Sequence, residues 1–172
     1  ETGIEVSIIS GIQEANFIYQ IVKANIELRS PSCITDIGGG SVECILISDP
    51  QSEVMAWSFP VGIQRLLDHF QIEDSPTNIQ IQNLKKYLDS LISLADRFPA
   101  TGISYQWIGT AGVFEIFTTL GDGNPLSSIP SCKVSTLIQK YLAMSQQQLS
   151  NMFGVTPYRL PAIYHTLILL DY

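Results

Sequence analysis

Charged residues, cysteines and long apolar runs are all scarce in this sequence. Only 15% of its 172 residues are charged, the net charge is −7, and there is no basic run. General nucleic-acid binders and anionic-membrane binders need clustered lysine and arginine, so the sequence argues against both classes. A phosphate ligand held by backbone N–H groups and a metal ion is not excluded by this shortage of positive charge.

The three cysteines, Cys33, Cys44 and Cys132, are an odd number without CxxC spacing. Reduced thiols in a cytoplasmic protein are the simplest interpretation. The longest apolar stretch, Leu160–Leu170, contains His165 and is too short to span a bilayer. No signal peptide is visible and the first residue is not methionine, so we expect a fragment of a longer protein.

Apolar residues make up 45% of the chain, enough to bury a core, and its length fits one domain or one large lobe. The pattern predicts, in chain order, a strand at 4–9, a helix after 10–11, strands at 32–37, 41–48 and 53–60, helices at 62–70 and from 77, a strand at 104–108, a short helix at 113–120, a loop at 120–130, a helix at 133–144, a capped turn at 145–154 and a last helix from 156–157. Three strands in series with tight turns predict an antiparallel meander. The whole order predicts an α/β lobe with a mixed sheet flanked by helices.

Two of the predicted helices have a recognisable start. Ser10 is followed by Gln13 with the spacing of a capping box. Thr77 and Gln80 repeat that spacing. The apolar positions recur at helical intervals, at Ala15, Ile18, Val22 and Ile26 in the first helix and at Leu84, Leu88, Leu91, Ala95 and Phe98 in the second.

The stretch CITDIGGGSVECILIS, residues 33–48, interrupts a strand pattern with Asp36 and three glycines, Gly38, Gly39 and Gly40. A strand interior gains nothing from glycines, which add no packing surface. Glycines can take positive φ, which favours a hairpin turn at this point. Such a turn brings backbone N–H groups together with no Cβ in the way, and this arrangement suits phosphate.

Two carboxylates flank that turn, since Asp36 enters it and Glu43 leaves it. They would repel a phosphate unless a cation lay between them, and magnesium, with its hard oxygen ligands, fits best. Ser41 adds a hydroxyl donor. The alternative is a glycine-rich hairpin whose Asp36 only caps the turn, and the spacing alone leaves both interpretations open.

The string TDIGGGSVE, residues 35–43, resembles the phosphate loop of the exopolyphosphatase/guanosine pentaphosphate phosphohydrolase (Ppx/GppA) family. Four other segments resemble motifs of that family in the family's order: IEVSIISGIQEANFIY (4–19), SFPVGIQRLLDHF (58–70), WIGTAGVFEIF (107–117) and FGVTPYRLPAIYHTLILL (153–170). The resemblance covers essentially the whole chain. It implies a ribonuclease-H-like lobe of the actin, sugar-kinase and Hsp70 ATPase superfamily. Residues 1–172 would form a single lobe, the second half of a two-lobe phosphatase domain.

The resemblance implies magnesium-dependent removal of the terminal phosphate from inorganic polyphosphate or guanosine pentaphosphate, in a cleft between two lobes. It assigns the base for the attacking water to Glu14, which matches the second glutamate of the family's Ser-Gly-x-Glu-Glu-Ala segment. It matches Asp36 and Glu43 to the acidic pair that would hold magnesium. The phosphate-binding positions that we carry over are Gly38, Gly39, Gly40, Ser41, Gly109 and Gly112.

Several of these residues have an alternative interpretation from the sequence alone. Glu14 is also a first-turn carboxylate that would stabilise its helix dipole. Arg65 could contact a phosphate or equally pair with Asp68. For His69 and His165, which lack a second ligand at useful spacing, we expect solvated or packed rings rather than metal ligands.

The chain departs from the family pattern at two positions, where Gln13 replaces a glutamate and Val113 replaces a threonine. The family's first phosphate loop has no match, so we expect the missing first lobe as a partner and little or no catalysis by this lobe alone. The family's habit also suggests a homodimer of the intact protein. A non-catalytic phosphate- or nucleotide-binding module, a sugar- or acetate-kinase relative, and a scaffold domain stay open as other functions. The sequence does not separate polyphosphate from guanosine pentaphosphate, nor does it assign a role to Arg159.

Overall fold

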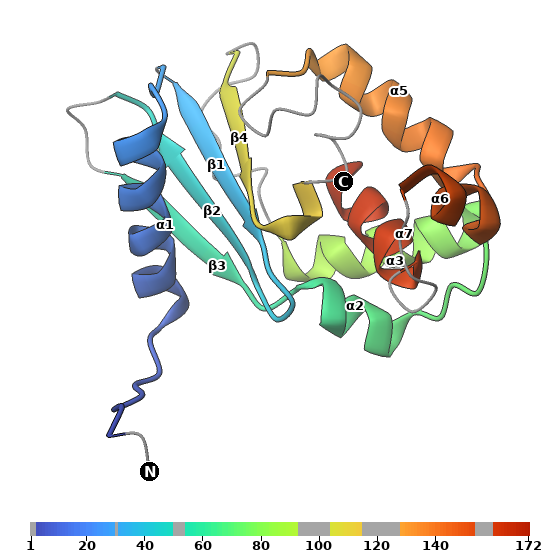
Figure 1. Ribbon diagram of the computed structural model, residues 1–172, viewed down its shortest axis with the longest axis horizontal. Coiled ribbons are helices and arrows are strands. Elements are labelled where there is room, and N and C mark those ends of the chain that lie inside the picture. The colour runs from blue at the N-terminus through green and yellow to red at the C-terminus, as the bar shows by residue number, and fades with distance from the viewer. Residues whose placement is uncertain (1–2, 30, 50–53, 93–103, 115–127, 154–159) are drawn as a thin grey trace.

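The computed structural model describes residues 3–29, 31–49, 54–92, 104–114, 128–153 and 160–172. A twisted sheet has α1 on one face and the other helices on the opposite face (Figure 1). The elements are α1 (Gly11–Asn25), β1 (Ser32–Ile37), β2 (Val42–Ile47), β3 (Met55–Phe59), α2 (Ile63–His69), α3 (Asn78–Leu91), β4 (Gln106–Thr110), the 3-10 helix η1 (Gly112–Phe114), α5 (Ser131–Leu142), α6 (Gln146–Phe153) and α7 (Leu160–Leu170).

The sheet has four strands in the order β3-β2-β1-β4. Strands β1, β2 and β3 form the predicted antiparallel meander, and β4 lies parallel to β1 at the other edge. The prediction of a mixed sheet flanked by helices is therefore confirmed. Strand β4 runs two residues further than expected, so Gly109 lies within the strand rather than in the turn after it.

Helix α1 begins as its sequence predicts. The backbone N–H of Ser10 donates to Gln13 Oε1 at 2.8 Å, and the N–H of Gln13 donates back to Ser10 Oγ at 3.3 Å. The same capping box starts α3 at Thr77. The apolar face of α1 packs on the sheet with Ala15, Tyr19 and Val22 buried against the cluster Ile34, Ile45, Ile47 and Ile108.

The opposite face of the sheet carries the larger core, built around α7. Among the described helices, none combines the length and the apolar character needed to cross a membrane. His165 of α7 is fully buried, with Nδ1 at 2.7 Å from the Pro161 carbonyl oxygen and Nε2 at 2.8 Å from that of Phe70. His69 is exposed and stacks on Tyr87. Both histidines thus have the packed or solvated roles expected of them.

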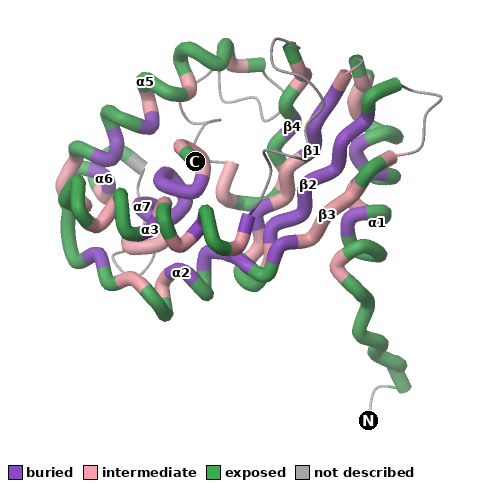
Figure 2. The backbone as a smooth tube through the Cα atoms, turned by 180° about the vertical axis from the view of Figure 1, so that it is seen from behind, coloured by how far each residue is buried: buried purple, intermediate pink, exposed green. Residues whose placement is uncertain are grey.

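The strand predicted at 4–9 does not form. This segment has no regular secondary structure, and Ile4, Val6 and Ile8 are 75%, 87% and 100% exposed. Figure 2 shows the segment as an exposed arm that leads away from the sheet. An alternating pattern forms a strand only when a neighbouring strand accepts its hydrogen bonds, and no described strand lies beside this one.

Parts of several predicted elements lie outside the described residues. These parts are 95 and 98 in the second capped helix, most of the helix at 113–120, most of the loop at 120–130, and the start of the last helix at 156–157, together with Arg159. Of the helix at 113–120, the structure describes only the end of η1. The capped turn predicted at 145–154 is the two-turn helix α6.

The three cysteines differ sharply in their surroundings. Burial raises the pKa of Cys33 to about 12 and that of Cys44 to about 11, whereas Cys132 is exposed. Because the thiolate is the reactive form, we expect iodoacetamide to alkylate Cys132 alone in the folded protein at neutral pH. Peptide mass mapping after labelling with and without denaturant measures this. Rapid labelling of Cys33 or Cys44 without denaturant would contradict the prediction.

Candidate active site at the hairpin end of the sheet

One row of four polar side chains crosses the whole sheet. Asp36 is paired with Glu43 between β1 and β2. Glu43 is paired with Ser58 of β3, and Asp36 with Thr110 of β4. Residues paired directly across strands point to the same face, so these four side chains share the face that α1 covers. The row lies next to the turn between β1 and β2 (Figure 1).

Each carboxylate of the row accepts a hydrogen bond from the strand outside it. Ser58 Oγ donates to Glu43 Oε1 at 2.7 Å, and Thr110 Oγ1 donates to Asp36 Oδ2. Glu43 is 1% exposed, and its Oε2 has no partner in hydrogen-bonding geometry within the described part of the chain. Sequence reasoning identified the two carboxylates but did not assign a role to either hydroxyl.

The charge state of Glu43 reflects this setting. Burial raises the pKa of Glu43 above its ordinary value, and the charges of Glu14 and Asp36 raise it further. The hydroxyls of Ser58 and Ser41 act in the opposite direction. The predicted catalytic residue, the predicted metal pair and the turn serine are thus close enough to influence one carboxyl group.

Helix α1 approaches the row through Gly11. A Cβ at this position would lie 2.2 Å from Ser58 Oγ and 3.7 Å from Glu43 Oε1. The absence of a side chain therefore lets the first turn of the helix pack directly on the row. Glu14 is in that turn and is exposed. Gln13, which replaces a glutamate of the family pattern, closes the capping box with its side-chain oxygen.

The glycine turn forms the predicted hairpin, closed by the Gly38 N–H donating to the Ser41 carbonyl at 3.0 Å. The expected positive φ is not used there, because among the described residues only Gly3 and Ala111 have it. What these glycines provide instead is free space, because they carry no side chain. A Cβ at Gly40 would meet no atom within 4 Å, so this side of the turn is open.

The start of α2 fixes the turn from behind. The N–H groups of Ile63 and Gln64 donate to the carbonyls of Gly38 and Gly39 at 3.0 and 2.9 Å. A Cβ on Gly62 would lie only 2.5 Å from the carbonyl carbon and oxygen of Gly39. The turn and the helix start are therefore in backbone contact, which only glycine permits at residue 62.

Arg65 lies in the first turn of α2 and reaches back to the glycine turn. Its Nε donates to the Gly40 carbonyl at 2.7 Å. Asp68, the alternative partner, accepts instead from Gln64 Nε2 at 3.0 Å. A guanidinium is thus anchored at the open side of the turn, where a phosphate would need positive charge.

The two glycines of the second glycine segment, Gly109 and Gly112, differ in the space beside them. Gly109 faces Phe114, whose ring atoms would be 2.3 Å from a Cβ there, so the ring already fills that space. Gly112 starts η1, and no atom of the described residues lies within 4 Å of its Cβ position. Of these two predicted phosphate-binding glycines, only Gly112 has room beside it. Thr110, between them, contributes its hydroxyl to Asp36.

The residues present fit a magnesium ion only together with a ligand. Within the described ranges, no group of three or more histidine, cysteine or carboxylate side chains could hold a metal. Asp36 and Glu43 are neighbours in register, and Glu43 Oε2 lacks a partner among the residues that the structure describes. Magnesium is commonly held by one or two carboxylates plus phosphate oxygens and water, which matches this donor set.

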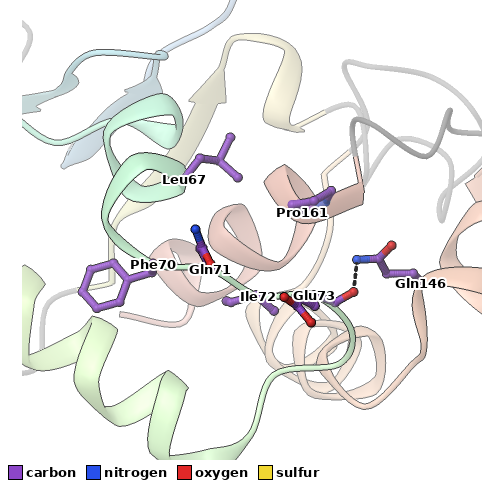
Figure 3. A pocket seen from close by; sticks show the side chains of 7 residues that line it. All are labelled: Leu67, Phe70, Gln71, Ile72, Glu73, Gln146 and Pro161. Carbon is purple, nitrogen blue, oxygen red and sulfur yellow. Dashed lines mark hydrogen bonds between the residues drawn. The ribbon is translucent and has the colours of Figure 1, made fainter.

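A hollow of about 330 Å³ lies elsewhere, on the helical side of the molecule, and its lining is drawn in Figure 3. It is lined by Leu67, Phe70, Gln71, Ile72, Glu73, Gln146 and Pro161. Gln146 Nε2 donates to the Glu73 carbonyl across it. None of the predicted site residues lines this hollow, so the candidate active site remains the row and the glycine turn.

Two curated exopolyphosphatases are similar in sequence to this chain. Exopolyphosphatase 2 of Mycobacterium tuberculosis (strain CDC 1551 / Oshkosh) is 23% identical over 171 residues, covering 94% of this chain and 53% of the relative. Exopolyphosphatase 1 of Mycobacterium leprae (strain TN) is 26% identical over 172 residues, covering 95% of this chain and 50% of the relative. The chain spans about half the length of the curated relatives it matches.

Solved structures show the same fold. A crystal structure of an exopolyphosphatase from Cytophaga hutchinsonii has a TM-score of 0.80 at 24% identity, covering 99% of this chain and 58% of that one. A Ppx/GppA family member from Aquifex aeolicus has a TM-score of 0.75 at 19% identity, covering 99% of this chain and 56% of that one. The expected ribonuclease-H-like fold is thereby confirmed. A model of the Ppx/GppA phosphatase family also matches residues 1–171. The chain therefore belongs to the Ppx/GppA phosphatase family.

Proposed function

We propose that the protein containing this chain is a cytoplasmic, magnesium-dependent exopolyphosphatase, which removes the terminal phosphate from inorganic polyphosphate or guanosine pentaphosphate. This chain would form the second lobe and one wall of the active-site cleft, with little turnover alone. The observation that carries the proposal is the buried Glu43 carboxyl beside an open glycine turn, with one of its oxygens unpartnered in the described part of the structure. The exopolyphosphatase names of the relatives favour polyphosphate as the substrate.

The proposed step is a single displacement at phosphorus. The oxygen of a water molecule attacks the terminal phosphorus as its proton passes to the Glu14 carboxylate. The bridging P–O bond breaks, and its electron pair leaves with the bridging oxygen on the shortened chain. The products are inorganic phosphate and a chain one unit shorter. Glu14 suits the role of base because it is exposed to solvent in the first turn of α1 and close enough to affect Glu43.

Phosphoryl transfer depends mostly on positioning and on stabilising charge. In the proposal, the glycine turn donates backbone N–H groups to phosphate oxygens, and the guanidinium of Arg65 adds positive charge at Gly40. Asp36 and Glu43 would hold magnesium, which supplies neutralising charge between phosphate oxygens. Without that ion, the same two carboxylates would repel the substrate.

Isothermal titration calorimetry of this chain with tripolyphosphate, with and without magnesium, tests the binding part of the proposal. We expect magnesium-dependent binding that Gly40→Val abolishes, because the added side chain would occupy the open side of the turn. Arg65→Gln should weaken binding by about tenfold, as expected for the loss of one charge-assisted contact.

Arg29→Gln is the matched control, since Arg29 is exposed and precedes β1 at the end of the strand far from the glycine turn. It should bind like the unmodified chain. Equal weakening of binding by Arg29→Gln and Arg65→Gln would show that the effect of Arg65→Gln comes only from the change in overall charge. Binding that changes neither without magnesium nor in Gly40→Val would overturn the proposed site. Phosphate release by the intact protein and its Glu14→Gln form then tests turnover.

A further inference from the structure

We propose that Ser58 and Thr110 are positioning residues for the phosphatase reaction, which hold the carboxylates of Glu43 and Asp36 in their working orientation. The inference rests on the proposed function, because it assigns a task to two hydroxyls of that same site. It adds β3 and β4 to the active site, which otherwise draws its acidic pair from β1 and β2.

The geometry of the row carries this inference. Both donors are on the outer strands and both acceptors on the inner strands, in direct register. Ser58 bonds Oε1 of Glu43 at 2.7 Å, and Thr110 bonds Oδ2 of Asp36. Each hydroxyl therefore fixes one oxygen of its carboxylate. The second oxygen of Glu43 is left without a partner among the described residues.

A carboxylate held in this way suits a ligand-binding role. A hydroxyl that binds one oxygen fixes rotation about the last side-chain bond and leaves the other oxygen for magnesium or phosphate-bound water. Partners of this kind orient carboxylates that bind metal ions in proteins, and losing one commonly lowers metal affinity or activity 10–100-fold. In the described part of the chain, Glu43 Oε2 has no other partner and is therefore the oxygen left for such a ligand.

The packing around Ser58 admits only a small side chain. Its Oγ and Cβ would be 2.2 and 2.5 Å from a Cβ on Gly11, so the first residue of α1 has no side chain where the serine lies. A larger residue at either position would push α1 away from the row. The close approach thus encloses the bond between Ser58 and Glu43, and low exposure strengthens a hydrogen bond to a carboxylate.

The test compares Ser58→Ala and Thr110→Val with two matched control variants. Ser90→Ala and Thr136→Val remove hydroxyls that bond the carbonyls of Tyr87 and Cys132 inside helices α3 and α5. Thr110→Ser retains a hydroxyl and serves as the conservative rescue. Each protein is titrated with tripolyphosphate in the presence of magnesium, and crystal structures of the unmodified chain and Ser58→Ala report the position of the Glu43 carboxylate.

We expect binding to weaken about tenfold in Ser58→Ala and in Thr110→Val, while Thr110→Ser and both controls stay within about twofold of the unmodified chain. Binding unchanged in Ser58→Ala and Thr110→Val would overturn the inference and leave the proposed function standing. If the unmodified chain binds no tripolyphosphate, the proposed function fails at this lobe. The crystal structures then decide the inference: a Glu43 carboxylate that keeps its place in Ser58→Ala overturns it, and a rotated one supports it.

Discussion

Gly62→Ala should destabilise the chain by about 3 kcal/mol and abolish phosphate binding at the glycine turn. The new Cβ would lie 2.5 Å from the Gly39 carbonyl carbon and oxygen and 2.7 Å from the Gly40 nitrogen. These are backbone atoms of a turn that α2 already holds by two hydrogen bonds, so they cannot move aside cheaply. Gly62 has φ −152°, which any residue adopts, so the expected effect is purely steric.

Urea unfolding followed by circular dichroism measures this change in the free energy of unfolding, and calorimetry with tripolyphosphate measures the loss of binding. Gly40→Ala is the matched control in the same turn, since its Cβ would meet no atom within 4 Å. Its free energy of unfolding should stay within about 0.5 kcal/mol of the unmodified chain. Equal stability of the two variants would show that α2 does not depend on backbone contact with the turn.

His165→Leu should lower the free energy of unfolding by about 2–3 kcal/mol. The ring is fully buried, and its Nε2 meets the Phe70 carbonyl, at the C-terminal cap of α2, at 2.8 Å. Nδ1 likewise faces the Pro161 carbonyl at 2.7 Å, and leucine supplies no donor, so whichever of the two carbonyls accepts from the ring would lose its hydrogen bond. Since α2 also holds the glycine turn at its other end, we expect tripolyphosphate binding to weaken as well.

His69→Leu is the control for this substitution. Nδ1 of His69 lies 3.0 Å from the carbonyl oxygen of Arg65, four residues earlier in the same helix, but the His69 side chain is exposed. Its replacement should cost less than about 1 kcal/mol, including the loss of stacking on Tyr87. Thermal unfolding of both variants in parallel provides the comparison. Similar losses for the two histidines would mean that the buried bond to Phe70 contributes little.

Local patterns predicted the elements whose signals lie within a few residues of one another. The capping pairs located the starts of α1 and α3, and the glycine turn located the β1–β2 hairpin. Asp36 and Glu43 were correctly expected to converge, because two strands joined by a short turn fix their own register. The ring of His165 was expected to be either solvated or packed, and it is packed.

The features that depend on distant partners were not predictable in this way. Thr110 bonds Asp36 across 74 residues, and nothing in the local sequence distinguishes it from a surface threonine. The space beside Gly109 is filled by the ring of Phe114, which follows β4 in the chain and folds back onto it. The segment 4–9 has the alternating pattern of a strand, but no strand lies beside it in the described structure. The prediction of a strand there was therefore wrong.

The polar row also has a consequence for the order in which the protein folds. One half of it, Glu43 with Ser58, spans 15 residues and belongs to a meander of local contacts, which form early and fast. The other half, Asp36 with Thr110, forms only when β4 docks in parallel beside β1. This contact closes a loop of 74 residues, and the entropy lost on closing the loop opposes it. A nascent or partly unfolded chain therefore contains the acidic pair and the glycine turn before it has both hydroxyls. Formation of the complete site would accordingly indicate that the whole sheet has formed, and not only that the chain has become compact.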